Sequence, residues 1–200
     1  MKTILLLVRH GETVDNVGQI MQGQTQGQLT AQGIRQAEAL RDRLAADAID
    51  AVVASDLRRA TDTARIVAAP HGLTVVTTPL LRERDWGDFT GRYIPSLKGE
   101  PWPQNVEPLE ALMERARRLL HDIYNEYPGL TVLAVGHGIV NKAIQAVYHH
   151  CTMSQISRMQ NAEVRMLLLR HDERQTMTND KFFGASTIKS ERKFCHLMTI

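Results

Sequence analysis

The chain has 200 residues and a mass of 22.5 kDa, which suffices for one sizeable hydrophobic core but hardly for two. A net charge of +2, with 43% hydrophobic and 23% charged residues, is typical of a globular protein and excludes a disordered or fibrous chain. Because there is no Lys/Arg block and no stretch long enough to span a bilayer, we expect no nucleic-acid partner and no membrane. The apolar run near the N-terminus is shorter than a secretory signal core, and two cysteines make no disulfide framework, so we expect a cytoplasmic protein.

The first predicted element is a buried strand at residues 4–8, an apolar run that ends abruptly at Arg9, His10 and Gly11. In open α/β sheets, ligands bind beyond the carboxyl ends of the strands, so these three residues fall where a small anion would bind. Residues 13–29 follow, rich in Gly and Gln without an apolar period, and they predict a binding loop.

Strands and helices alternate along the rest of the chain. Thr30 is the expected N-cap of a helix that reaches about residue 46, and Ser55 or Asp56 is the expected N-cap of a helix that ends before Pro70. The other predicted strands cover residues 49–54, 73–77, 131–135 and 164–169, the last near the sheet edge, and the other helices cover residues 109–123 and 139–147. This alternation predicts an α/β fold, a three-layer sandwich with a mostly parallel central sheet and helices on both faces. We expect one domain over residues 1–172 and a polar C-terminal tail over residues 173–200.

Two more strand ends carry charged or polar groups. Residues 131–135 lead into His137, so a second imidazole reaches the sheet edge that holds His10. Arg58 and Arg59 follow the strand at 49–54, and adjacent helical residues point about 100° apart, so only one of the two faces the pocket easily. The sequence therefore predicts a cationic pocket built around a histidine.

Five groups of residues occur along the chain in a characteristic order. They are Arg9-His10-Gly11-Glu12-Thr13 with Asn16, Leu29-Thr30 with Gly33 and Gln36-Ala37, Ser55-Asp56-Leu57-Arg58-Arg59-Ala60 with Thr63-Ala64, Leu81-Arg82-Glu83 with Gly87 and Gly91, and Gly136-His137-Gly138. Together they resemble the phosphatase branch of the histidine phosphatase superfamily, also called phosphoglycerate mutase-like. The resemblance extends from Lys2 to about Leu169.

The resemblance implies phosphoryl transfer through a phosphohistidine and assigns a role to each motif. The residues implied for catalysis are His10 as nucleophile, Arg9, Arg59 and His137 around the phosphoryl group, and Glu83 as proton donor, with Asp85 or Asp88 in reserve. The residues expected to bind the substrate are Gly11, Asn16, Gln22, Gly23, Trp86 and Gly138. By the same motif Arg59 faces the pocket, and Arg58 is expected to face solvent.

The chain also departs from the family's pattern. Asp15 stands where the family often has Trp, Gln26 and Gln28 replace a frequent Asp and Pro, and Gly136 replaces a frequent Ser. None of these changes removes a group needed for the transfer. They leave the identity of the substrate open rather than the type of reaction.

The residue types suit attack on a phosphate monoester. Arginine stays charged and offers a planar fork of donors that matches phosphate oxygens. A histidine nucleophile must be neutral, and Arg9 and Arg59 favour that form, while a backbone carbonyl is expected to hold its other ring nitrogen as N–H. Glu83 would protonate the leaving oxygen. Desolvation by Trp86 and Phe89 would favour its protonated form, whereas Arg82 and Arg84 would favour the ionised form if their charged groups point inward. This scheme needs no metal and no cofactor.

Three functions remain after this reasoning. The first is a phosphatase that acts on a small phosphorylated metabolite. The second is a phosphoglycerate mutase-type transferase, which must keep water from the phosphohistidine and therefore needs a closing lid. Mutases of the resembled family carry a longer insertion after the acid than residues 84–108 provide, which favours hydrolysis. The third is a protein that binds phosphorylated ligands without turnover, and a homodimer is left open.

Overall fold

The computed structural model describes residues 2–170, and the predicted tail at residues 173–200 lies outside the described residues. Five strands form one sheet in the order β3-β2-β4-β1-β5. Their bounds are β1 (Lys2–Arg9), β2 (Ala51–Ser55), β3 (Val75–Thr78), β4 (Thr131–Gly136) and β5 (Val164–Arg170). β1, β4, β2 and β3 run parallel, and β5 pairs antiparallel with β1. The prediction of a mostly parallel sheet with the last strand at an edge is confirmed.

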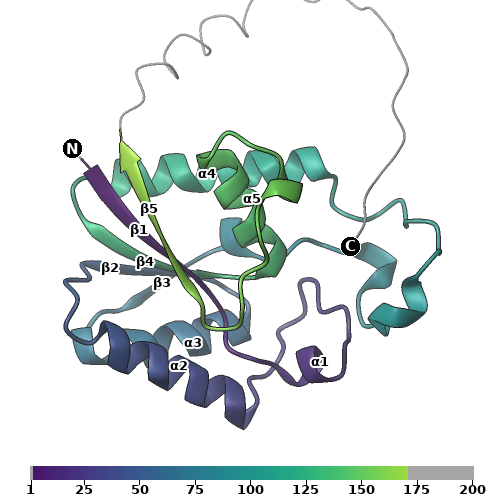
Figure 1. The fold of residues 1–200 in the computed structure, drawn as a ribbon, viewed down its shortest axis with the longest axis horizontal. Coiled ribbons are helices and arrows are strands. Elements are labelled where there is room, and N and C mark those ends of the chain that lie inside the picture. The colour runs from purple at the N-terminus through teal and green to yellow at the C-terminus, as the bar shows by residue number, and fades with distance from the viewer. Residues whose placement is uncertain (1, 171–200) are drawn as a thin grey trace, which may run out of the picture. The chain divides into compact units, whose positions relative to one another are not determined.

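Helices cover both faces of this sheet (Figure 1). The helices are α1 (Val14–Val17), α2 (Ala31–Leu44), α3 (Arg58–Ala68), α4 (Leu109–Glu126) and α5 (Gly138–Tyr148). Leu40 and Val67 pack with β1 and β2 on the face of α2 and α3, whereas Leu112 and Ile144 pack on the face of α4 and α5. The three-layer α/β architecture is therefore confirmed. None of the helices within the described residues is long and apolar enough to cross a membrane.

Two local predictions were wrong. The loop expected at residues 13–29 contains the short helix α1, which begins with a capping box between Thr13 and Asn16. The N-cap of α3 is Leu57 rather than Ser55 or Asp56. The side-chain oxygen of Gln26 accepts from the Arg58 N–H, so a distant loop satisfies the start of this helix and no local cap is needed.

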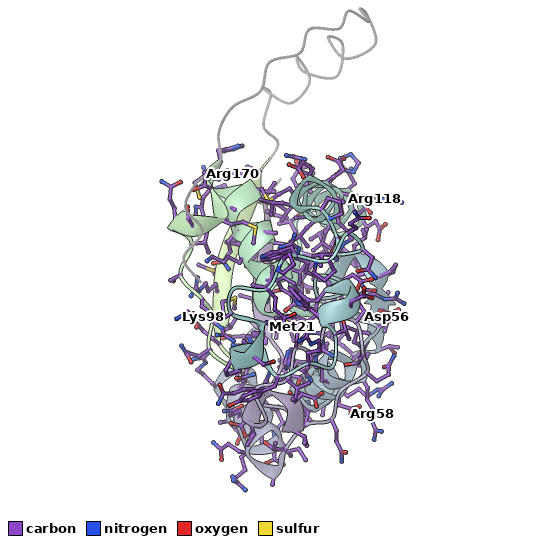
Figure 2. All side chains as sticks on the ribbon, turned by 90° about the vertical axis from the view of Figure 1, so that its right-hand side faces the viewer. Met21, Asp56, Arg58, Lys98, Arg118 and Arg170 are labelled. Carbon is purple, nitrogen blue, oxygen red and sulfur yellow. The ribbon has the colours of Figure 1, made fainter. Side chains whose placement is uncertain are left out.

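The segment between β3 and α4 has no long regular element. It contains the short 3₁₀ helices η2 (Pro79–Leu81), η3 (Gly87–Phe89) and η4 (Ile94–Leu97), as its mixture of charged residues and prolines predicts. A further two 3₁₀ helices, η1 (Ala69–His71) and η5 (Met153–Gln155), follow α3 and α5. The segment is tied to the first loop by an isolated bridge between Ile20 and Tyr93. Figure 2 views the molecule from this side, with Met21 near the centre.

Candidate active site

The pairing of two central strands brings the two predicted histidines together. β1 and β4 are parallel neighbours, and Arg9 is the register partner of Gly136. The next residue on each strand is a histidine, so both imidazoles leave the sheet at the same level. The ring centroids of His10 and His137 lie 5.0 Å apart.

The hydrogen bonding of His10 fixes which ring nitrogen can attack. Its Nδ1 lies 2.7 Å from the carbonyl oxygen of Gly11, so Nδ1 carries the proton and Nε2 keeps a free electron pair. Burial, and then the charges of Arg59 and Arg9, hold the pKa of His10 well below 6.5. The ring is therefore neutral at physiological pH, as a nucleophile must be. The backbone carbonyl predicted to hold the ring is that of Gly11.

His137 has the opposite arrangement of donor and acceptor. The Nε–H of Arg59 donates to Nδ1 of His137 over 3.0 Å, which places the ring proton on Nε2. Burial and the nearby Arg59, His10 and Arg9 hold the pKa of His137 well below 6.5. Among the described residues, Nε2 of His137 and Nε of Arg9 are buried and have no hydrogen-bond partner. These two N–H groups are suited to donate to the oxygens of a bound anion.

Arg59 is a buried cation held by backbone carbonyls. It is 1% exposed, and its guanidinium donates to the carbonyl oxygens of Gly23, over 2.8 Å, and Thr25. Burial lowers the pKa of Arg59 to about 10, so it stays charged near neutral pH. Arg58 pairs with Asp62 and projects from the surface, as predicted (Figure 2). The second guanidinium beside the two histidines is therefore that of Arg59.

Glu83 lies at the N-terminus of α5, whose N-cap is His137. Its carboxylate accepts hydrogen bonds from the backbone N–H groups of Ile139 and Val140, each over 3.1 Å, and from that of Arg84 over 2.9 Å. These contacts fit a negative charge at a helix N-terminus. The catalytic acid predicted from the sequence thus lies beside the second histidine.

The aromatic residues that follow Glu83 in the chain pack on Trp102 and under Arg84. The ring of Trp86 packs against Trp102 with centroids 5.7 Å apart, Phe89 lies 6.2 Å from Trp102, and the Arg84 guanidinium lies over both indoles. The Glu83 carboxylate is instead held by the amides of α5. Desolvation of Glu83 by these two rings stays a prediction.

The reserve acids, Asp85 and Asp88, use their carboxylates within their own loop. Asp85 accepts from the Gly87 N–H over 2.9 Å, and Asp88 accepts from the Asn105 side chain over 2.9 Å. Neither makes a hydrogen bond to the two histidines. Glu83 makes no such bond either, but it differs from these two carboxylates in lying at the N-terminus of α5, whose N-cap is His137.

The residues expected to bind substrate differ in what they can offer. The Gly11 N–H already donates to Thr63 Oγ1 over 3.1 Å, so it is not a free donor. A Cβ at Gly138 would lie 3.6 Å from Oε2 of Glu83 and 3.7 Å from Nε of Arg9, so this glycine borders the space between acid and guanidinium. Gly23 has a φ of 51° and lends its carbonyl to Arg59.

Two positions near His10 were not predicted from the sequence. The Asn161 side chain donates to the carbonyl oxygen of His10 over 3.1 Å and to Oδ1 of Asn16 over 3.2 Å, and the carbonyl of Met159 accepts from Arg9 over 2.7 Å. The predicted edge strand could have indicated them. Because β5 runs antiparallel to β1, it begins at the carboxyl end of β1, beside His10. Polar residues just before such a strand are therefore candidates for the site.

The chain belongs to the histidine phosphatase superfamily (branch 1), whose family model matches residues 5–180. The solved structures that it resembles include a putative α-ribazole-5′-P phosphatase from Escherichia coli, with a TM-score of 0.77, 28% identity and coverage of 84% of this chain and 91% of that one. A mycobacterial glucosyl-3-phosphoglycerate phosphatase has a TM-score of 0.76, 28% identity and coverage of 84% and 91%. A protein named probable phosphoglycerate mutase GpmB, from Yersinia enterocolitica, is 37% identical over 149 residues, which are 68% of this chain and 69% of the relative.

Proposed function

We propose that this protein is a phosphomonoesterase that hydrolyses a small phosphorylated metabolite through a phosphohistidine on His10, with Glu83 as proton donor. The observation that carries the proposal is the state of the His10 ring. Its Nδ1–H donates to the carbonyl oxygen of Gly11, and its pKa is lowered by burial and by the charges of Arg59 and Arg9. A neutral Nε2 among buried cationic and N–H donors is the arrangement that attack on a phosphate dianion requires.

The reaction then proceeds in two balanced steps. In the first, Nε2 of His10 forms a bond to phosphorus, the bond to the leaving oxygen breaks, and Glu83 gives that oxygen a proton. Because the backbone amides around Glu83 favour its carboxylate, this proton has to enter the site with the substrate. Arg9, Arg59 and the Nε2–H of His137 stabilise the charge on the three remaining oxygens. In the second, Glu83 takes a proton from water, which attacks phosphorus and releases inorganic phosphate and free His10.

The substrate class is a small phosphate monoester. The structural relatives support this class because two of them are named for phosphatases of small phosphorylated compounds. The runner-up is a mutase-type transferase, which is supported by the printed name of the Yersinia relatives. A cytoplasmic location and the absence of a cofactor remain parts of the proposal.

Trapping the intermediate tests the nucleophile. His10→Ala should abolish phosphate release from p-nitrophenyl phosphate in metal-free buffer, whereas His121→Ala, which removes an exposed histidine on α4, should leave it unchanged. The wild-type chain should yield an acid-labile, base-stable phosphoprotein that His10→Ala lacks. Full turnover by His10→Ala would refute this assignment.

A second experiment separates hydrolysis from isomerisation. Incubation with 3-phosphoglycerate, followed by ³¹P NMR, distinguishes release of inorganic phosphate from formation of 2-phosphoglycerate. We expect phosphate release to be faster than isomerisation of 3-phosphoglycerate. A panel of phosphorylated metabolites then identifies the substrate from which phosphate is released fastest. Isomerisation faster than phosphate release would establish the mutase instead.

A further inference from the structure

Four side chains form a continuous hydrogen-bonded row beside the two catalytic groups His10 and Arg59. Nδ2 of Asn161 donates to Oδ1 of Asn16 over 3.2 Å, and Nδ2 of Asn16 donates to Oε1 of Gln22 over 3.2 Å. Nε2 of Gln22 then donates to Oδ2 of Asp15 over 2.9 Å. The row thus ends on a carboxylate at the start of α1.

The direction of the row is fixed at both ends. The backbone N–H of Thr13 can only donate, and it donates to Oδ1 of Asn16 over 3.3 Å. An ionised carboxylate can only accept, so Asp15 requires the NH₂ side of the Gln22 amide. If either amide turned over, two oxygens or two NH₂ groups would face each other within the row. Each amide is therefore held in one of its two orientations.

This row borders the proposed phosphoryl site. Gln22 is 8% exposed, and a Cβ at Gly27 would lie 2.7 Å from Nε2 of Gln22 and 3.3 Å from Nη1 of Arg59. Asn161 also binds the backbone carbonyl of His10. The negative charge of Asp15 acts on Arg59, whose pKa it raises against the larger effect of burial. The amides therefore lie against the guanidinium and the nucleophile.

We propose that Asp15 is a positioning residue that orients the Gln22 amide, whose other side is held by Asn16, so that Gln22 presents an N–H group to the phosphoryl group. An amide nitrogen has two N–H groups, and the row uses one from each side chain, which leaves the second for the oxygens of a bound anion. A turned amide would present its carbonyl oxygen to the same anion. The proposal rests on the proposed function for the nature of the ligand, a phosphate.

A simpler role for Asp15 predicts the opposite result. If Asp15 acted only as a negative charge near a cationic pocket, its removal would strengthen phosphate binding, because like charges repel. If it orients the Gln22 amide, its removal weakens phosphate binding, because a neutral Asn can donate as well as accept and leaves Gln22 fixed from the Asn16 side alone. The sign of the change in phosphate affinity therefore distinguishes the two roles.

The test measures the Kd of inorganic phosphate and the kinetics of p-nitrophenyl phosphate for the full chain. Asp15→Asn should weaken phosphate binding about fivefold, as expected for one misdirected hydrogen bond, and raise KM more than it lowers kcat. Asp15→Glu should restore most of the affinity. Asp42→Asn removes an exposed carboxylate paired with Arg41 and should leave the Kd within about twofold.

A double-mutant cycle keeps the test independent of folding defects. In a Gln22→Leu background no amide is left for Asp15 to orient, so Asp15→Asn should no longer weaken phosphate binding. Unchanged or tighter binding by Asp15→Asn in the wild-type background would overturn the proposal, and so would an equal loss in both backgrounds. Because phosphate binding needs no turnover, this result is separable from a failure of His10 as nucleophile.

Discussion

The ion pair between Arg115 on α4 and Glu107 is expected to support the loop that carries Glu83. The Nε and Nη2 groups of Arg115 donate to both carboxylate oxygens of Glu107, each over 2.9 Å. Its Nη1 donates to the carbonyl oxygens of Leu80 and Arg82, over 2.9 and 2.7 Å. Replacement by Met keeps an unbranched apolar stem but removes the guanidinium and with it every one of these contacts. The change therefore tests the support of the acid without touching it.

The size of the effect follows from how deeply the pair is buried. The side chains of Arg115 and Glu107 are only 16% and 13% exposed, so Arg115→Met leaves a carboxylate largely out of water without its partner. Breaking such a pair costs about 3 kcal/mol of unfolding free energy or more. Arg117→Met breaks a pair with Glu114 whose side chains are 56% and 73% exposed, and such pairs contribute about 0–1 kcal/mol. The two variants should therefore differ by at least about 2 kcal/mol.

Urea denaturation of the two variants and of wild type measures this difference. The double variant Arg115→Met with Glu107→Gln should recover part of the loss, because it removes the unpaired charge as well. Activity gives a second readout: kcat/KM should fall more for alkyl phosphates than for p-nitrophenyl phosphate, whose leaving group needs less protonation. If Arg115→Met were as stable as Arg117→Met, or lost activity equally on both substrates, the reasoning about this pair would fail.

Two further predictions concern the histidines and the glycines. Burial lowers the pKa of His10 and His137 below 6.5, so below about pH 6.5 the unfolded chain binds more protons than the folded chain. Each histidine therefore lowers the free energy of unfolding by about 1.4 kcal/mol per pH unit as the pH falls below that value. Urea titrations at pH 7.5 and 5.5 should show this loss, and His137→Asn should show a smaller one; an equal loss in both proteins would contradict it. Gly11→Ala should destabilise the fold by about 1–3 kcal/mol, because its Cβ would collide with the Gly33 carbonyl, whereas Gly138→Ala, with contacts of 3.6 Å or more, should keep its thermal midpoint but raise KM. Similar midpoints for both alanine variants would count against this.

The sequence predicted the sheet and the long helices because each of them buries an apolar pattern that local residues supply. The strand before His10 is a continuous apolar run, and α4 repeats leucines on one face. It did not predict α1, which buries no residue and is held by a side-chain capping box instead of a core. The start of α3 was wrong for a related reason, since its cap comes from Gln26, 32 residues away in the chain.

The candidate site was predictable in its residue types but not in its hydrogen bonds. Motif and strand-end reasoning brought His10 and His137 to one edge, where the register of β1 and β4 places them side by side. Their tautomers depend on the Gly11 carbonyl and on Arg59, which only the folded chain brings into contact. The cradle of Glu83 likewise comes from backbone amides, which every residue but proline has, so no pattern of side chains could reveal it.

Four arginines differ in whether a carboxylate accepts their hydrogen bonds, and this difference explains why the site around His10 remains cationic. Arg115 and Arg82 pair with carboxylates and brace loops. Arg9 and Arg59 are buried, and within residues 2–170 neither forms an ion pair. Arg9 donates to the neutral carbonyl of Met159, and Arg59 donates to that of Gly23. A neutral acceptor satisfies a donor without cancelling its charge, so both guanidiniums keep their charge for an incoming dianion. A carboxylate in either place would have stabilised the empty pocket and weakened its attraction for phosphate.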